Sequence, residues 1–159
     1  MVQPINTVNL RKAKEIDLPF IHSLSAILAA GAKLAWHTNE AIQTFQDDYI
    51  AEMMAETTVR HTTLIAERDG VALGFIHVRE SKDDISGEEC GTVPLLAVTE
   101  AAQGAGIGKL LMEAAESWSR EKGFRLLHLE VFSTNDQARY FYDSLGFKPD
   151  TINMIKALG

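Results

Sequence analysis

The sequence lacks most features of a secreted, membrane or nucleic-acid-binding protein. It has one cysteine, Cys90, so an internal disulfide is excluded and a reducing compartment is expected. No uncharged apolar run is long enough to cross a bilayer, and residues 1–18 lack the hydrophobic core of a signal peptide. The net charge of −7 argues against a nucleic-acid partner, which would favour a basic face. We therefore expect a cytoplasmic protein with no membrane or nucleic-acid partner.

Length and composition are those of one globular domain. The chain has 159 residues, of which 46% are hydrophobic, and shows no internal repeat or low-complexity tract. We expect a single domain over residues 1–159. The apolar pattern predicts, in order, a strand at 6–13, helices at 18–28 and 39–55, strands at 63–67, 71–78 and 95–98, a helix from 107, a strand at 124–132, a helix from 136 and a last strand at 151–158. Asp69-Gly70 is a hairpin signal, and the polar segment 79–91 predicts a loop or an irregular strand start.

The most informative stretch is 95–109, LLAVTEAAQGAGIGK. An apolar strand ends at Val98, and a Gly-rich turn then opens an amphipathic helix. Free backbone N–H groups at such a helix N-terminus can bind phosphate. A P-loop is excluded, because its first glycine falls on Gln103 and its Ser/Thr on Leu110. The dinucleotide fingerprint fails too, since its third glycine falls on Lys109 or Leu111.

A second pattern follows in residues 129–147, LEVFSTNDQARYFYDSLGF. A strand runs into a cluster of N-cap residues, and Asn135 precedes a short helix that carries Ala138 and Tyr142. A Leu-Gly-Phe triplet at 145–147 closes the segment.

Together, Gln103, Gly106 and Gly108 in the first pattern and Asn135 and Tyr142 in the second resemble the GNAT superfamily of N-acetyltransferases, which bind acetyl-coenzyme A. The resemblance covers roughly the last two-thirds of the chain. It implies an α/β fold with a mixed, twisted sheet of about six to seven strands and about four helices on both faces. Residues 129–142 also resemble the ribosomal-protein alanine N-acetyltransferases.

The resemblance implies an enzyme that transfers the acetyl group of acetyl-CoA to a primary amine of a small molecule or protein, in a ternary complex and without a metal. It assigns cofactor binding to Leu96, Ala97, Val98, Gln103, Gly104, Ala105, Gly106, Ile107, Gly108, Lys109, Asn135, Ala138 and Tyr142. In relatives the strand before the loop pairs with the pantetheine arm, so the N–H of Val98 would point at the thioester oxygen. Relatives often form homodimers, so a homodimer is a further expectation.

Two side chains are catalytic candidates by this resemblance. Tyr142 is the expected general acid, although a phenol with a pKa near 10 needs help from the site to protonate a thiolate whose conjugate acid has a pKa near 8.5. Glu130 occupies the strand position that relatives use as proton acceptor. His77, Glu80 and Glu89 remain rival bases at this stage.

The acceptor stays open. Asp83, Asp84, Glu88 and Glu89 can bind a cation or form a solvated loop, and Trp36 and His37 can line an entrance or pack in the core. Two other functions also remain: a non-catalytic acyl-CoA binding or sensing module, and a transferase that uses another acyl group or an oxygen acceptor.

Overall fold

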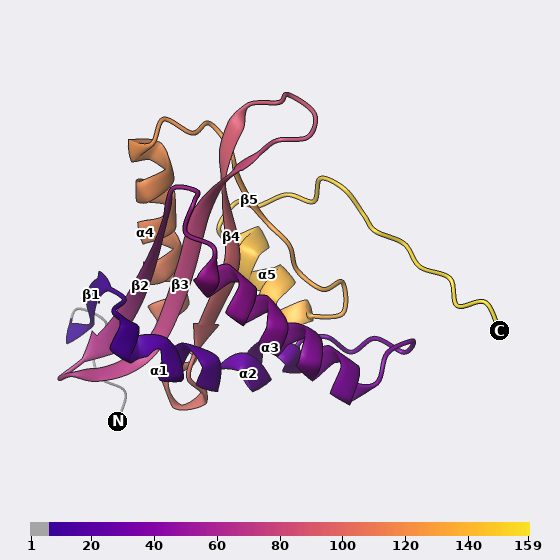
Figure 1. The fold of residues 1–159 in the computed structure, drawn as a ribbon, viewed down its shortest axis with the longest axis horizontal. Coiled ribbons are helices and arrows are strands. Elements are labelled where there is room, and N and C mark those ends of the chain that lie inside the picture. The colour runs from indigo at the N-terminus through magenta and orange to yellow at the C-terminus, as the bar shows by residue number, and fades with distance from the viewer. Residues whose placement is uncertain (1–6) are drawn as a thin grey trace.

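The computed structural model describes residues 7–159 and has the mixed α/β architecture expected from the sequence (Figure 1). Its elements follow the chain in the order β1 (Asn9–Lys12), η2 (Glu15–Asp17), α1 (Leu18–Ser23), α2 (Ser25–Ala30), α3 (Asn39–Ala55), β2 (His61–Arg68), β3 (Val71–Lys82), β4 (Glu89–Val98), η3 (Glu100–Ala102), α4 (Ile107–Glu121), β5 (Leu127–Leu129) and α5 (Asp136–Ser144). No helix within residues 7–159 is long and apolar enough to span a membrane.

The described strands form one sheet in the order β1-β2-β3-β4-β5. Neighbouring strands from β1 to β4 run antiparallel, and β5 runs parallel to β4. The sheet therefore has five strands within residues 7–159, fewer than the six to seven expected. The predicted last strand at 151–158 is not formed, because no neighbouring strand pairs with it. The strand expected at 124–132 shortens to Leu127–Leu129, the part that pairs with β4.

Helices cover both faces of the sheet, as expected. On one face, α4 and α5 pack over Ile76 and Val78 of β3. On the other face, α1, α2 and α3 pack over Phe75 of β3 and Leu95 of β4 (Figure 1). This division follows from the alternation of side chains along a strand.

Local signals explain most connections. Asp69 and Gly70 both have positive φ, 52° and 77°, as a two-residue hairpin turn requires. The first predicted helix is split by Leu24, which leaves helical geometry at φ −89° and ψ 1° and lies buried. The prediction for segment 79–91 was wrong in part. Strands β3 and β4 extend to Lys82 and from Glu89, because Arg60 pairs with polar side chains of both strands.

Candidate active site

The candidate site begins where β4 and β5 separate. The register between β3 and β4 shifts once, so that Val93 and Pro94 of β4 both lie opposite Val78 of β3. This is a β-bulge, a feature that bends a strand and ends regular pairing. Strand β5 pairs with β4 only at Gly91–Val93. Beyond the bulge, the edge of β4 is therefore open toward a gap between the two strands.

Backbone groups of β4 face this gap. The N–H of Thr99 donates to the carbonyl of Leu73 at 2.8 Å, so Thr99 is oriented toward β3. Because orientation alternates along an antiparallel strand, the N–H groups of Leu96 and Val98 point away from β3 and into the gap. The carbonyl of Val98 points the same way and accepts a hydrogen bond from Gln103 Nε2 at 3.2 Å. The gap thus has a peptide edge with donors on alternate residues.

The Gly-rich loop leads from this edge to the N-terminus of α4. Gly104 and Gly106 have φ of 83° and 81°, in the left-handed region that favours glycine. Gly106 is the N-cap of α4, no side chain caps the helix, and the bond from the N–H of Leu110 to the carbonyl of Gly106 closes its first turn. Lys109 lies in this turn and is exposed, although a helix N-terminus disfavours cations. The loop is therefore suited to an anion.

Helix α5 is held against the start of α4. A Cβ on Gly108 would lie 3.3 Å from Cζ of Phe141, so the two helices approach too closely for a larger residue without a shift. The next residue, Tyr142, is half-buried and packs its ring against Phe147 with centroids 5.8 Å apart. Burial raises the pKa of Tyr142 to about 12, so its phenol is protonated at neutral pH but is a weaker acid than an exposed tyrosine.

Asn135 connects α5 to the other side of the molecule. Its Oδ1 accepts a hydrogen bond from the N–H of Ala138 at 3.2 Å and so caps α5. Its amide group lies directly against Gly31, at the end of α2, where an added Cβ would come within 2.9 Å of Asn135 Cγ. The N–H of Lys33 also donates to Thr134 Oγ1 at 3.1 Å. Residues 31–33 therefore contact the segment before α5.

Glu130 follows β5 and is exposed. Burial is the main cause of the raised pKa of Tyr49 in α3, and the negative charge of Glu130 raises it further. The side chains of Glu130 and Tyr49 therefore lie near each other. Tyr49 stacks on Phe45, with ring centroids 5.9 Å apart, and Phe45 is 55% exposed. Both aromatics lie in the helix that the sequence predicts at 39–55. Their spacing of four residues was the one signal that Phe45 and the half-buried Tyr49 stack on each other.

The three rival bases all bind other side chains of the protein. His77 is buried, with Nδ1 2.7 Å from Thr63 Oγ1 and Nε2 accepting from Arg79 Nε at 3.0 Å. Burial, with the nearby charge of Arg79, lowers the pKa of His77 to about 3. Arg60 Nε lies 2.8 Å from a carboxylate oxygen of Glu80, and Arg60 Nη2 lies 2.9 Å from one of Glu89.

Two carboxylates of the loop between β3 and β4, those of Asp83 and Glu88, are also engaged in hydrogen bonds and ion pairs. Asp83 is buried, accepts two hydrogen bonds from backbone N–H groups, and lies 3.1 Å from His128 Nε2. Glu88 pairs with Arg125. Trp36 and His37 lie in the loop between α2 and α3, where Trp36 is 45% exposed and is thus not a core residue.

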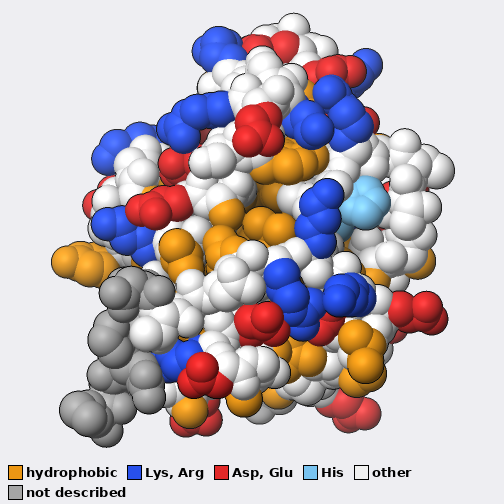
Figure 2. Space-filling view, turned by 90° about the vertical axis from the view of Figure 1, so that its left-hand side faces the viewer, with side chains coloured by type: hydrophobic (Ala, Val, Ile, Leu, Met, Phe, Trp, Pro, Cys, Tyr) orange, Lys and Arg blue, Asp and Glu red, His pale blue; other side chains and the backbone are white. Residues whose placement is uncertain are grey.

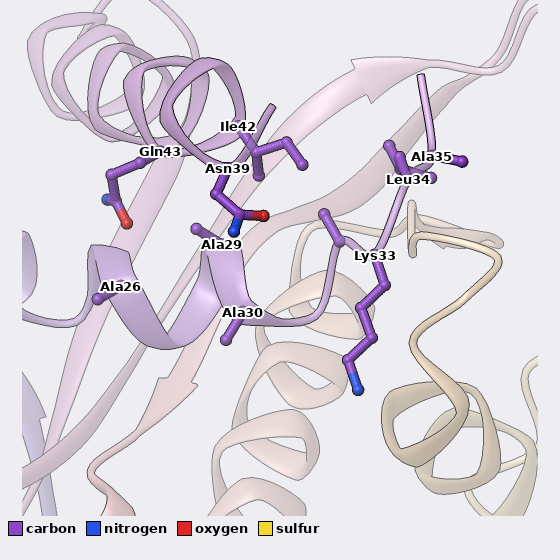
Figure 3. A pocket seen from close by; sticks show the side chains of 10 residues that line it. Ala26, Ala29, Ala30, Lys33, Leu34, Ala35, Asn39, Ile42 and Gln43 are labelled. Carbon is purple, nitrogen blue, oxygen red and sulfur yellow. The ribbon is translucent and has the colours of Figure 1, made fainter. Parts of the chain in front are cut away.

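A separate open pocket of about 570 Å³ lies between α2 and α3. Ala26, Ala29 and Ala30 form one wall, and Lys33 extends away from them (Figure 3). None of its lining residues is a site residue predicted from the sequence. The predicted residues gather instead at the gap between β4 and β5, along the loop and on α5.

Comparison with known proteins identifies the family. Residues 28–147 match the model of the acetyltransferase (GNAT) family. The chain belongs to the GNAT family. A mycothiol acetyltransferase from Rhodococcus jostii (strain RHA1) is 31% identical over 125 residues, which are 74% of this chain and 39% of the relative. The matched regions cover 28% to 41% of the length of the first three curated relatives, so this GNAT chain spans less than half of each.

Solved structures show the same fold. An aminoglycoside N-acetyltransferase in complex with CoA has a TM-score of 0.67 and 19% identity, over 95% of this chain and 94% of the other. The ribosomal-protein-alanine N-acetyltransferase from Brucella melitensis biovar Abortus 2308 has a TM-score of 0.68 and 19% identity, over 95% and 99%. The expected GNAT fold is thereby confirmed.

Proposed function

We propose that this GNAT protein is an N-acetyltransferase that transfers the acetyl group of acetyl-CoA to a primary amine, in a ternary complex. The observation that carries the proposal is the open edge of β4, which leads directly to the uncapped N-terminus of α4. We further propose that residues 1–159 act as one domain in the cytoplasm, where the thiol of Cys90 stays reduced.

The gap and the loop suit the pantetheine arm and the pyrophosphate of acetyl-CoA. The outward N–H groups of Leu96 and Val98, with Ala97 between them, would hold the amide-containing arm, and residues 103–109 would hold the pyrophosphate. Lys109 adds positive charge beside those phosphates. Asn135 and Ala138, at the start of α5, would line the opposite side of the arm.

Bound acetyl-CoA supplies an activated acetyl group as a thioester. The N–H of Leu96 or Val98 would stabilise charge on the carbonyl oxygen, a contribution of about 3 kcal/mol when one such donor is removed. Tyr142 would donate its phenol proton to the departing sulfur; because burial raises the pKa of Tyr142 to about 12, this transfer needs the charge that develops on the bound sulfur to drive it. Glu130 would accept a proton from the amine on the side where Tyr49 lies.

The test compares Tyr142→Phe with Tyr140→Phe in the same helix. Tyr140 is 79% exposed, so its variant is a matched control for loss of a phenol. Thiol release from acetyl-CoA is followed over polyamines, aminoglycosides, amino acids and peptides. We expect kcat to fall about 100-fold in Tyr142→Phe and to stay unchanged in Tyr140→Phe. Equal rates in both variants would refute the role of Tyr142. Binding of acetyl-CoA with no turnover on any amine would instead favour an acyl-CoA sensor.

A further inference from the structure

The connection between α2 and α3 brings a lysine to the wall of the proposed cofactor gap. The N–H of Lys33 donates to Thr134 Oγ1 at 3.1 Å, and Gly31 lies directly against the side chain of Asn135. Asn135 is one of the residues proposed to line the arm of acetyl-CoA. The backbone of Lys33 is therefore fixed beside the place where this arm would lie.

The amine of Lys33 is free to reach into that space. The side chain is exposed and extends away from Ala29 and Ala30 at the end of α2 (Figure 3). No carboxylate within residues 7–159 forms an ion pair with its ammonium group, in contrast to Lys148, which pairs with Asp143. Because lysine has a flexible four-carbon stem, the amine can sample the surroundings of its backbone.

Lys33 also lies on the side from which an acceptor would approach. Helices α1 to α3 cover the face of the sheet that contains Leu95, and α3 carries Tyr49 near Glu130, the proposed base. Residues 31–38 connect α2 to α3 and belong to the same layer. An amine on this connection therefore approaches the gap from the same side as an external amine.

We propose that the protein acetylates its own Lys33 when acetyl-CoA is bound and no other acceptor is present. This inference rests on the proposed function. The nitrogen of Lys33 attacks the thioester carbon, a C–N bond forms and the C–S bond breaks. The proton that the nitrogen loses balances the one that the leaving sulfur takes up. Because amine and thioester are held by one molecule, the step gains the high effective concentration of an intramolecular reaction.

The modification would change the pocket between α2 and α3. Lys33 is the only charged residue among the ten described residues that line this pocket of about 570 Å³. Acetylation replaces its ammonium group by a neutral amide. Asn39 and Gln43 already contribute amides to the same lining. Acetylation of Lys33 would therefore switch the pocket from a cationic to a neutral site.

The first test follows acetyl incorporation by peptide mass spectrometry, with the full chain and acetyl-CoA but no added amine. Lys12 of β1 is the internal control, because it is also exposed. Strand β1 lies on the side of the molecule where Lys and Arg side chains are spread over the surface (Figure 2). We expect Lys33 to be acetylated at least about tenfold faster than Lys12, at a rate independent of protein concentration. Equal rates at both lysines, or a rate that rises with protein concentration, would overturn the proposal.

A second acetyl donor separates position from reactivity. S-acetyl-N-acetylcysteamine carries the same thioester without the phosphates, so the loop at 103–109 has no anion to hold. With this donor, Lys33 and Lys12 should react at similar rates. An advantage of Lys33 that persists with this donor would mean that the side chain is reactive by itself, which refutes the argument from position.

Variants and external amines complete the test. In intact-mass spectra, Lys33→Arg should lose the singly acetylated species, whereas the matched control Lys12→Arg should keep it. A species that survives in Lys33→Arg refutes the assignment. The panel of amines is run in parallel with the wild type. Turnover of an amine without label on Lys33 refutes self-acetylation and leaves the proposed function standing, whereas the absence of both refutes both proposals.

Discussion

Substituting Gly31 by alanine is a sharp test of the contact that holds Asn135. Gly31 has φ of −74° and ψ of −16°, which any residue adopts, so its backbone does not require glycine. Only the close approach of Asn135 does, since the new Cβ would lie 2.9 Å from Asn135 Cγ and still closer to Nδ2. Asn135 cannot move freely, because its Oδ1 accepts the hydrogen bond from Ala138. The methyl group should therefore displace the side chain and break the α5 cap.

Gly31→Ala has two effects on the free energy of unfolding, and they have opposite signs. Alanine in place of glycine at a compatible φ stabilises a protein by about 0.4–1 kcal/mol through the unfolded state. Loss of an N-cap hydrogen bond costs about 1 kcal/mol. Gly31→Ala should thus be neutral or slightly destabilising in the wild type. In an Asn135→Ala background the collision is absent, so the same substitution should raise the free energy of unfolding by about 0.4–1 kcal/mol.

Urea unfolding of the four proteins in this double-mutant cycle measures the coupling, which we expect to be about 1 kcal/mol. If Gly31→Ala stabilises both backgrounds equally, the contact with Asn135 does not constrain the structure and the reasoning fails. A kinetic readout depends in addition on the proposed function. The KM for acetyl-CoA should rise about two- to tenfold in Gly31→Ala with little change in kcat, as for loss of one hydrogen bond.

Two further predictions concern buried charges. Arg11 holds the pKa of Asp17 at about 2, well below the ordinary value of an aspartate, so this pair stabilises the fold above pH 4 and its contribution is lost as pH falls through 2. The free energy of unfolding in urea should fall by about 1–2 kcal/mol between pH 5 and pH 2, and Arg11→Met should remove this fall. An unchanged pH dependence of the free energy in that variant would contradict the assignment. Arg79 donates from Nη2 to the carbonyls of Met53 and Glu56 at the end of α3, at 2.8 and 3.1 Å. Arg79→Met leaves these acceptors unpaired and should cost about 2–4 kcal/mol in thermal or urea unfolding, against less than about 0.5 kcal/mol for the exposed Arg120→Met; equal costs would refute the capping role.

Elements with strong local signals were predictable from the sequence. Helix α3 has the expected bounds, Asn39–Ala55, because its apolar spacing is regular and Thr38 caps it with its side chain. The Asp69-Gly70 turn and the start of α4 after Gly106 also follow from local chemistry. For the site, order and spacing were enough to indicate the Gly-rich loop and the capping role of Asn135. The catalytic role of Tyr142 stays a prediction.

Features that depend on a partner strand were not predictable. The strand expected at 124–132 is rich in apolar residues, yet only three of its residues pair with β4. The apolar alternation at 151–158 is present, but alternation states only that a strand is possible and not where its partner lies. His77 likewise was a rival candidate for the base. Its pairing with Arg79 and Thr63 depends on strand register, which no local pattern reveals.

The bulge at Val93–Pro94 explains why the site lies where it does. The N–H of Gly91 donates to the carbonyl of Leu126, so before the bulge the odd-numbered residues of β4 face β5. Without the extra residue, Leu95 and Ala97 would face the gap. The bulge reverses the alternation, so that Leu96 and Val98 present their N–H groups there while Leu95 and Ala97 point their side chains into the core under α1–α3. Pro94 has no N–H and cannot extend the pairing with β5. One inserted residue therefore both opens the sheet and orients the donors that line the opening.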